Sequence, residues 1–196
     1  MGSEPAIEFA RGEKMRLYHT GYEEIREPDI HHGRKNADFG QGFYMTANKE
    51  FACRWARERA GKKTIMNTYE LDLSGLVLHR FERDTDWFNY IYNNRAGRPD
   101  PLAEADVIVG PIANDTIFDT FGIITSGFLS ADQAIKLLLI GPQYEQIVIK
   151  TASAAANLTW LSSRELSSAE IAQYREIVEA EQKEYQTLFA KTLEQM

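Results

Sequence analysis

The sequence predicts one mixed α+β domain followed by a C-terminal helix, because strand-like and helix-like segments alternate along it. Three runs, residues 15–21, 105–112 and 143–151, are rich in the β-branched and aromatic residues that favour strands. Apolar residues recur at helical spacing in residues 84–94 and 168–196, which is the pattern of an amphipathic helix. No internal repeat interrupts this order, so a single domain explains it.

The domain borders follow from where these patterns begin and end. Residues 1–14 show no clear period and predict an N-terminal extension or a cloning remnant. The domain covers residues 15–161, with further strands expected at residues 64–73 and ending near Leu78. Residues 162–196 then form a helical tail that packs on the domain or binds a partner.

Composition narrows the class of protein. A chain of 196 residues with 43% hydrophobic content can bury the core of one compact domain. The net charge of -7, without a block of Lys and Arg, argues against a nucleic-acid partner. No apolar run reaches membrane-spanning length and no signal segment opens the chain, so we expect no membrane partner and a cytoplasmic location. Delivery into another cell by a route that needs no signal also fits.

The sequence predicts no metal site. His31 and His32 are adjacent, so their side chains point apart, and no acidic or cysteine spacing completes a zinc pattern. The single cysteine, Cys53, forms no intrachain disulfide and is interpreted as a packed core thiol. Arg34 and Lys35 follow in the same loop and are candidates to meet an anionic ligand.

A histidine stands at the end of the first predicted strand. Residues 15–21 alternate and stop at Gly21, which places His19 near the C-terminal end of the strand. Such a position suits a catalytic side chain, and it equally suits a half-buried histidine hydrogen-bonded to backbone.

Residues 38–48 are the most distinctive stretch, because they combine two glycines, three aromatic residues and a helix start. Gly40 and Gly42 permit a positive φ or a close approach of backbone to a ligand. A short strand with Tyr44 follows, and Asn48 is expected to cap a helix over residues 49–62. The alternative is an ordinary tight turn with two core aromatics.

Two pairs of polar residues lie at the ends of later strands, one pair after a strand and the other at the start of a strand. Asn114 and Asp115 come after the strand at residues 105–112, where they cap the next helix or point into a site. Short helices are expected at residues 116–121 and 130–139. Glu145 and Gln146 stand at the start of the last strand of the domain.

Several separated motifs together resemble a known family: Leu17-Tyr18-His19, residues 38–46, residues 109–115 and residues 146–148. They look like domain-of-unknown-function family 3990, which is itself regarded as similar to the ADP-ribosyltransferases of the diphtheria-toxin and poly(ADP-ribose) polymerase class. The resemblance spans roughly residues 17–161. It implies an ADP-ribosyltransferase-like α+β fold of small split β-sheets with flanking helices, and NAD as co-substrate.

The resemblance also implies roles for single residues. The class uses a histidine to bond the ribose beside nicotinamide, here His19, and the backbone of the next residues, here Thr20 and Gly21, to bind the carboxamide. The class usually has glycine where Thr20 stands. Tyr44 matches the tyrosine that stacks on nicotinamide. By charge alone, Arg34 or Lys35 is expected to meet the pyrophosphate. The other residues of the expected NAD site are Asp38, Phe39, Gly40, Gly42, Phe43, Asn114 and Asp115.

Transfer of ADP-ribose from NAD needs a carboxylate beside the ribose, because breaking the bond between ribose and nicotinamide builds positive charge on the ribose. The class places its glutamate at the start of a late strand, which favours Glu145, whereas the family resemblance marks Gln146. Neighbours on a strand face opposite ways, so only one of the two points into the site. Asp115 is the alternative carboxylate.

The implied activity is a mono-ADP-ribosyltransferase that modifies a protein side chain and releases nicotinamide. The alternatives are an inactive module that binds NAD, ADP-ribose or a protein, and an NAD glycohydrolase with water as acceptor. A toxin, an effector and a housekeeping enzyme all fit this sequence, which predicts neither the acceptor nor the oligomeric state.

Overall fold

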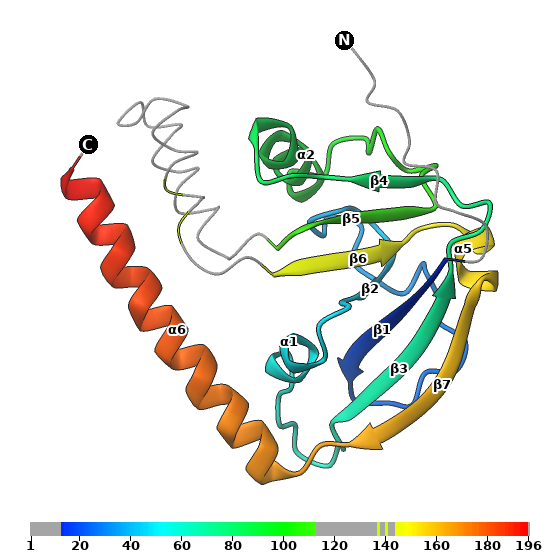
Figure 1. Cartoon of the computed structure of the whole chain (residues 1–196), viewed down its shortest axis with the longest axis horizontal. Helices are drawn as coiled ribbons and strands as arrows, with labels where there is room; N and C mark the ends of the chain where they lie inside the picture. The colour runs from blue at the N-terminus through cyan, green and yellow to red at the C-terminus, as the bar shows by residue number, and fades with distance from the viewer. Residues whose placement is uncertain (1–12, 113–136, 138–139, 141–143, 196) are drawn as a thin grey trace.

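Two small β-sheets packed face to face form the domain, and a long C-terminal helix extends along one side (Figure 1). This computed structural model describes residues 13–112, 137, 140 and 144–195. The three-stranded antiparallel sheet has the order β1 (Lys14–Gly21), β3 (Ile65–Asp72), β7 (Leu158–Glu165). The four-stranded sheet has the order β2 (Phe43–Met45), β6 (Glu145–Ile149), β5 (Val107–Pro111), β4 (Leu78–Arg80). The predicted α+β class with small sheets and a C-terminal helix is therefore confirmed.

The main core fills the space between the two sheets. Alternate residues of each strand point inward, so Leu17 and Tyr69 from one sheet meet Ile147 and Ile149 from the other. All four side chains are almost wholly buried. Each buried side chain of this size contributes about 1.5–3 kcal/mol through removal of apolar surface from water, so this layer holds the sheets together.

Helix α2 (Thr85–Arg95) covers the outer face of the four-stranded sheet (Figure 1). Asp84 caps its first turn by accepting from the backbone of Asp86 and Trp87. Trp87 is buried against Ile108 and Val148, and its indole nitrogen donates to the carbonyl of Pro111 at 2.9 Å. The four-stranded sheet is thus covered on both faces, which explains the uninterrupted apolar run of β5.

Helix α1 (Lys49–Arg54) is shorter than predicted, and the expectation of a helix over residues 49–62 is wrong. Asn48 caps it as expected, by accepting from the backbone of Phe51 at 3.0 Å. After Trp55 the chain turns back, because Arg59 and Lys62 pair across a turn in which Gly61 takes a φ of 72°. The helical spacing of apolar residues continues in the sequence after the helix ends at Arg54, which is why the sequence predicted a longer helix.

Helix α6 (Ser168–Glu194) begins with a capping box between Ser167 and Glu170. Its first turns pack on α1 through Ile171, which joins Cys53 and Met66 in a third apolar cluster. Cys53 is therefore the buried core thiol that the sequence predicted. Strand β7 runs through the expected border after residue 161, so the tail proper begins at the helix.

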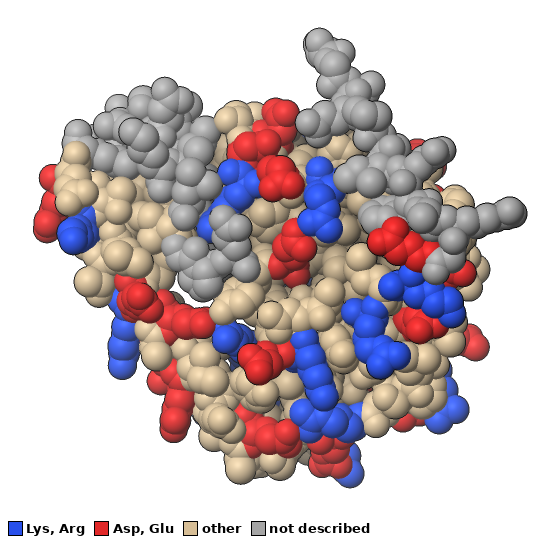
Figure 2. Space-filling model, in the orientation of Figure 1, with Lys and Arg blue, Asp and Glu red and all other residues tan. Residues whose placement is uncertain are grey.

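A short helix α5 (Ala152–Ala156) joins β6 to β7. The predicted helices at residues 116–121 and 130–139 lie outside the described residues, except for Leu137, which is helical. Among the helices that the structure describes, none has the length and apolar content to cross a membrane. Basic and acidic side chains are interspersed on the face shown in Figure 2.

Candidate active site

His19 points from β1 toward the four-stranded sheet. Its ring lies 4.6 Å from that of Phe43, and its Nδ1 is 2.8 Å from the carbonyl oxygen of Tyr44. Burial lowers the pKa of His19 below the ordinary 6.5, so the ring is neutral near pH 7. Because a carbonyl only accepts, the neutral ring carries its proton on Nδ1. Nε2 is then left as a hydrogen-bond acceptor.

The two sheets are joined beside His19 by one short bridge. The Tyr18 nitrogen donates to the Thr46 carbonyl at 2.9 Å, and the Thr46 nitrogen donates to the Tyr18 carbonyl at 3.0 Å. No further pairing between β1 and β2 follows within the described ranges, since β2 continues along β6 instead.

Beyond this bridge the backbone edge of Thr20 has no strand partner among the described residues, and we call it the open edge. On an antiparallel strand the N–H and carbonyl of alternate residues point to the same side, so those of Thr20 point the way that Tyr18 does. They have no hydrogen-bond partner in the part of the chain that the structure describes. The Thr20 side chain is buried and its hydroxyl donates to the Ala52 carbonyl at 2.7 Å, which fixes this edge against α1.

Asp38 anchors the start of the turn that contains Gly40 and Gly42, which we call the glycine turn. Its carboxylate accepts from Arg95 at 2.6 Å and lies 3.4 Å from the side-chain nitrogen of Gln146. Its carbonyl accepts from Asn94 at 3.1 Å. Asp38 thus ties the turn to α2 and β6 through groups of the protein itself.

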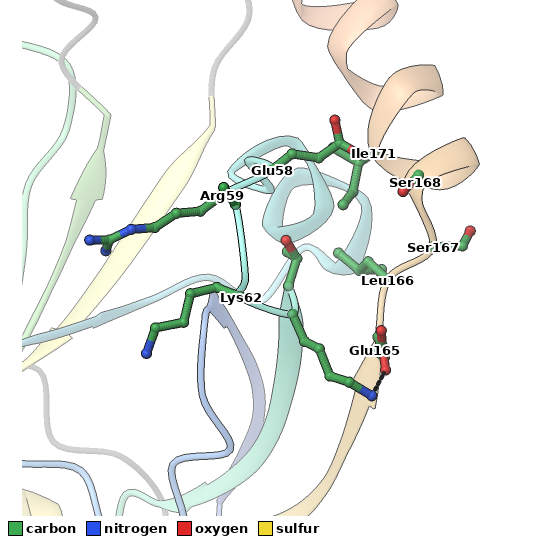
Figure 3. Close-up of a pocket in the computed structure, with 11 residues that line it drawn as sticks. Glu58, Arg59, Lys62, Glu165, Leu166, Ser167, Ser168 and Ile171 are labelled. Atoms are coloured by element: carbon green, nitrogen blue, oxygen red, sulfur yellow. Dashed lines mark hydrogen bonds and ion pairs between the residues drawn. The ribbon is translucent and has the colours of Figure 1, made fainter.

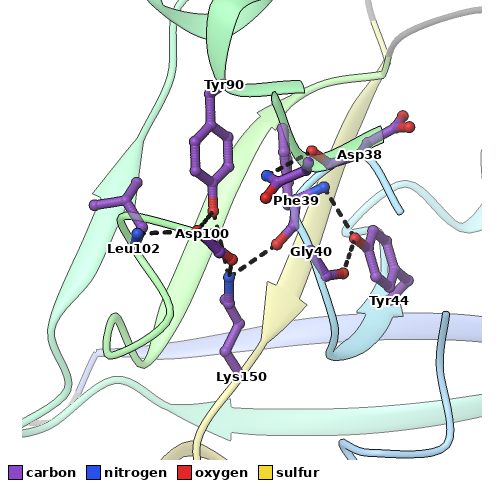
Figure 4. A network of polar contacts seen from close by, with 9 residues as sticks. Asp38, Phe39, Gly40, Tyr44, Tyr90, Asp100, Leu102 and Lys150 are labelled. Atoms are coloured by element: carbon purple, nitrogen blue, oxygen red, sulfur yellow. Dashed lines mark hydrogen bonds and ion pairs between the residues drawn. The ribbon is translucent and has the colours of Figure 1, made fainter. Parts of the chain in front are cut away.

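Tyr44 points to the opposite face of β2 from Phe43, toward the turn (Figure 4). Its hydroxyl donates to the Gly40 carbonyl at 2.7 Å and accepts from the Phe39 nitrogen at 3.0 Å. Burial raises the pKa of Tyr44 above its usual value, so the hydroxyl remains a donor at neutral pH. Tyr44 thus lies on the other face of β2 from His19, whose ring contacts Phe43.

A buried ion pair between Lys150 and Asp100 also stabilises the glycine turn. Lys150 donates to the carboxylate of Asp100 and, at 2.9 Å, to the carbonyl of Phe39 (Figure 4). Tyr90 donates to Asp100 at 2.7 Å. Gly40 has a φ of 75°, and a Cβ there would lie 2.4 Å from Asp100 Oδ2. This network explains why glycine is required at position 40.

Gly42 is also required by packing. A Cβ on it would lie 2.6 Å from both the carbonyl oxygen of Ile149 and a side-chain carbon of Val148. The turn packs closely against its neighbours at both positions. Packing therefore accounts for both glycines, and a ligand alone explains neither.

The structure distinguishes the two candidates on β6. Gln146 is buried on the outer side, near Asp38. Glu145 has the same orientation as Ile147, which belongs to the core between the sheets, and its side chain is 49% exposed at the rim of that face. Its carbonyl accepts from the hydroxyl of Thr46 at 2.9 Å, so the strand that carries it is tied to the bridge beside His19.

Two other groups lie next to Glu145. Arg80 of β4 donates to its carboxylate. The preceding residue, Tyr144, stacks on Phe51 at 4.2 Å between ring centroids and donates to Glu181 of α6 at 2.9 Å. Glu181 also accepts from Arg54 of α1. The start of β6 is thus held by α1 and α6 together.

The remaining predicted residues are dispersed. Gly21 closes β1 beside His19, where a Cβ would lie 3.2 Å from Nε2. Arg34 is exposed on the loop before the turn. Asn114 and Asp115 lie outside the described residues.

A pocket of about 380 Å³ lies elsewhere, between the segment after α1 and the start of α6 (Figure 3). Arg59, Lys62 and Ser167 are among its lining residues, and Lys63 bonds Glu165 across it at 2.6 Å. None of the predicted site residues lines it. Over the described ranges no group of three or more His, Cys, Asp or Glu side chains could hold a metal ion.

Sequence reasoning missed Arg80, Asp100 and Lys150. Lys150 could have been found, because a lysine at the end of a β-branched buried strand needs a partner. No local pattern marked Arg80 or Asp100, since each meets its partner only through sheet order and loop packing.

Comparison with known proteins identifies the family of the chain. The sequence profile of a family described as "Protein of unknown function (DUF3990)" matches residues 15–160. No curated protein and no solved structure gives a significant match. The matched region takes in His19, the glycine turn and Glu145, and it ends before α6. The chain therefore belongs to family DUF3990.

Proposed function

We propose that the protein is a mono-ADP-ribosyltransferase that transfers ADP-ribose from NAD to a protein side chain and releases nicotinamide. The observation that carries the proposal is the open edge at Thr20 beside the acceptor nitrogen of His19. A primary carboxamide presents an N–H donor and a carbonyl acceptor on one side, which is what a free strand edge pairs with. Nicotinamide carries such a group.

His19 supports the ribose in this mechanism. Its Nε2 accepts a hydrogen bond from a ribose hydroxyl, while Nδ1 remains on the Tyr44 carbonyl. The lowered pKa keeps the ring neutral, so it adds no positive charge next to a ribose that itself becomes cationic. Tyr44 points to the other face of β2 from Phe43 and His19, so in this proposal it supports the turn through Gly40 while Arg34 meets the pyrophosphate.

Glu145 supplies the negative charge. As the bond from ribose C1′ to nicotinamide breaks, its electron pair leaves with nicotinamide and the ribose becomes positive. A carboxylate beside the ribose stabilises that charge and takes a proton from the attacking group. Gln146 cannot do this because it carries no charge and points toward Asp38. It supports the turn instead.

The proposal can be tested because its two products, ADP-ribosylated protein and free nicotinamide, are measured separately. Purified protein is incubated with NAD labelled in the adenylate half, with and without cell lysate, and both labelled protein and free nicotinamide are measured. We expect both signals, and we expect both to fall in His19→Ala and Glu145→Gln. Nicotinamide release without labelled protein at any lysate dose would indicate an NAD glycohydrolase. Binding of NAD without either product would indicate an inactive binding module and contradict the proposal.

A further inference from the structure

Arg80 lies directly on the carboxylate that we propose as catalytic. Its Nη1 donates to Oε1 of Glu145. The contact spans β5, since Arg80 pairs with Val109 on that strand and Glu145 pairs with Pro111 two residues further on. Arg80 and Glu145 share the inner face of the sheet, as Leu78 and Ile147 beside them show. A guanidinium nitrogen therefore stands where an acceptor would meet Glu145.

We propose that Arg80 is itself an acceptor, so that the protein attaches ADP-ribose to its own Arg80 within one chain. The inference rests on the proposed transferase function and names one substrate of the same site: an arginine guanidinium. It also predicts that other acceptors of this enzyme are arginines.

The contact supplies what a guanidinium needs in order to react. A free guanidinium holds its protons too firmly to act as a nucleophile near pH 7. In contact with Glu145, it can pass the Nη1 proton to the carboxylate as the new bond forms. The C1′–nicotinamide bond breaks with its electron pair on nicotinamide, and the lone pair of Nη1 forms the new bond to C1′. The product remains a guanidinium, and Glu145 later releases the proton to water.

Exposure distinguishes Arg80 from the other paired arginines near the site. The side chains of Arg54 and Arg95 are 14% and 10% exposed and are held by Glu181 and Asp38. That of Arg80 is 32% exposed, and an exposed ion pair of this kind adds little stability. The guanidinium can therefore leave the carboxylate, let the ribose approach and return as the nucleophile.

Modification would limit the enzyme's own activity. An attached ADP-ribose fills the space in front of Glu145 and brings two phosphates to it. We therefore expect a burst of nicotinamide release that slows as Arg80 becomes modified.

The test maps the modified residue in the full chain. Purified protein is incubated with NAD without lysate, digested and analysed by mass spectrometry with electron-based fragmentation. We expect ADP-ribose on the peptide at Arg80, lost in Arg80→Lys and retained in Arg26→Lys, an exposed arginine paired with Glu24. When Glu145→Gln chains, which keep Arg80, are incubated with NAD together with tagged wild-type chains and are then separated from them, the Glu145→Gln chains should remain unmodified at Arg80.

The outcomes separate this inference from the proposed function. Nicotinamide release with Arg80 unmodified would overturn the inference and leave the transferase function in place. Modification of Arg80 on the Glu145→Gln chains would show transfer between chains and overturn the intrachain proposal. Absence of both nicotinamide release and modification in the wild-type protein would overturn both proposals.

Discussion

At the scale of single residues, the protonation state of His19 has a consequence for stability. The folded ring resists protonation because it is buried, whereas in the unfolded chain it takes up a proton near the ordinary pKa of 6.5. Below that pH the unfolded state binds more protons than the folded state, so the free energy of unfolding falls as the pH falls. Above it, both states are neutral at this residue and the contribution is constant.

His19→Gln should remove this pH dependence. The wild-type protein should lose up to about 1.4 kcal/mol per pH unit from this group below pH 6.5, until the folded-state pKa is reached. Urea unfolding at pH 7.5 and 5.5 measures the difference. His32→Gln is the control, because His32 is exposed. Equal pH slopes for wild type and His19→Gln would contradict the buried neutral histidine.

Gly40 and Gly75 form a matched pair for testing the turn. Both have a φ of 75°, but a Cβ on Gly75 meets nothing within 4 Å whereas one on Gly40 meets Asp100 and Lys150. Gly75→Ala should cost about 1 kcal/mol for the left-handed backbone alone, and Gly40→Ala about 3 kcal/mol. Urea unfolding of both variants gives the comparison, and equal costs would show that the turn has room to adjust.

At the scale of elements, most strands and helices could be predicted from local patterns. The alternation in β1 and the apolar run of β5 predicted these strands correctly, and the apolar spacing over residues 84–94 correctly predicted α2. The end of α1 could not be predicted, because the turn through Gly61 is set by pairing across it and the apolar spacing continues. Whether Glu145 or Gln146 faces the core between the two sheets depends on the sheet register, which cannot be read from the sequence of one strand.

The buried pair of Lys150 and Asp100 connects β6 to the turn and to the loop after α2. Lys150→Met should destabilise the fold by about 3–5 kcal/mol, because it leaves Asp100 buried without its partner. Lys14→Met removes an exposed pair with Glu70 and should cost less than about 1 kcal/mol. Adding Asp100→Leu to Lys150→Met should recover part of the loss in urea unfolding, and a further loss of full size would contradict their coupling.

Helix α6 depends on a contact far from its first turn. Beyond Tyr174 its side chains are partly or fully exposed, and Glu181 is held there by Arg54 and Tyr144. Glu181→Ala should raise amide hydrogen exchange in the second half of α6 by about tenfold and leave β3 unchanged, since a charge-assisted bond of this kind contributes about 1.5 kcal/mol. Exchange mass spectrometry measures this. Glu179→Ala, at an exposed position, should have no such effect; equal changes in both variants would contradict the role of the contact.

At the scale of the whole molecule, the candidate site arises where two sheets meet and separate. His19 comes from one sheet and Glu145 from the other, and the bridge between Tyr18 and Thr46 holds the sheets in register beside them. Tyr44 lies on the other face of β2, toward the turn. The sequence predicted His19, Tyr44 and Glu145 as separate candidates. It could not predict the open edge at Thr20 or the contact of Arg80, because both depend on how the two sheets are placed.

Nicotinamide release from NAD by the purified chain, compared between wild type and Glu145→Gln, tests this site most directly. We predict that Glu145→Gln lowers kcat at least about 100-fold while the KM for NAD changes little, because the charge acts on the transition state. Glu165→Gln, the same change at a surface glutamate paired with Lys63, should behave as wild type. Release by Glu145→Gln at the wild-type rate would contradict the assignment of Glu145 as the catalytic carboxylate.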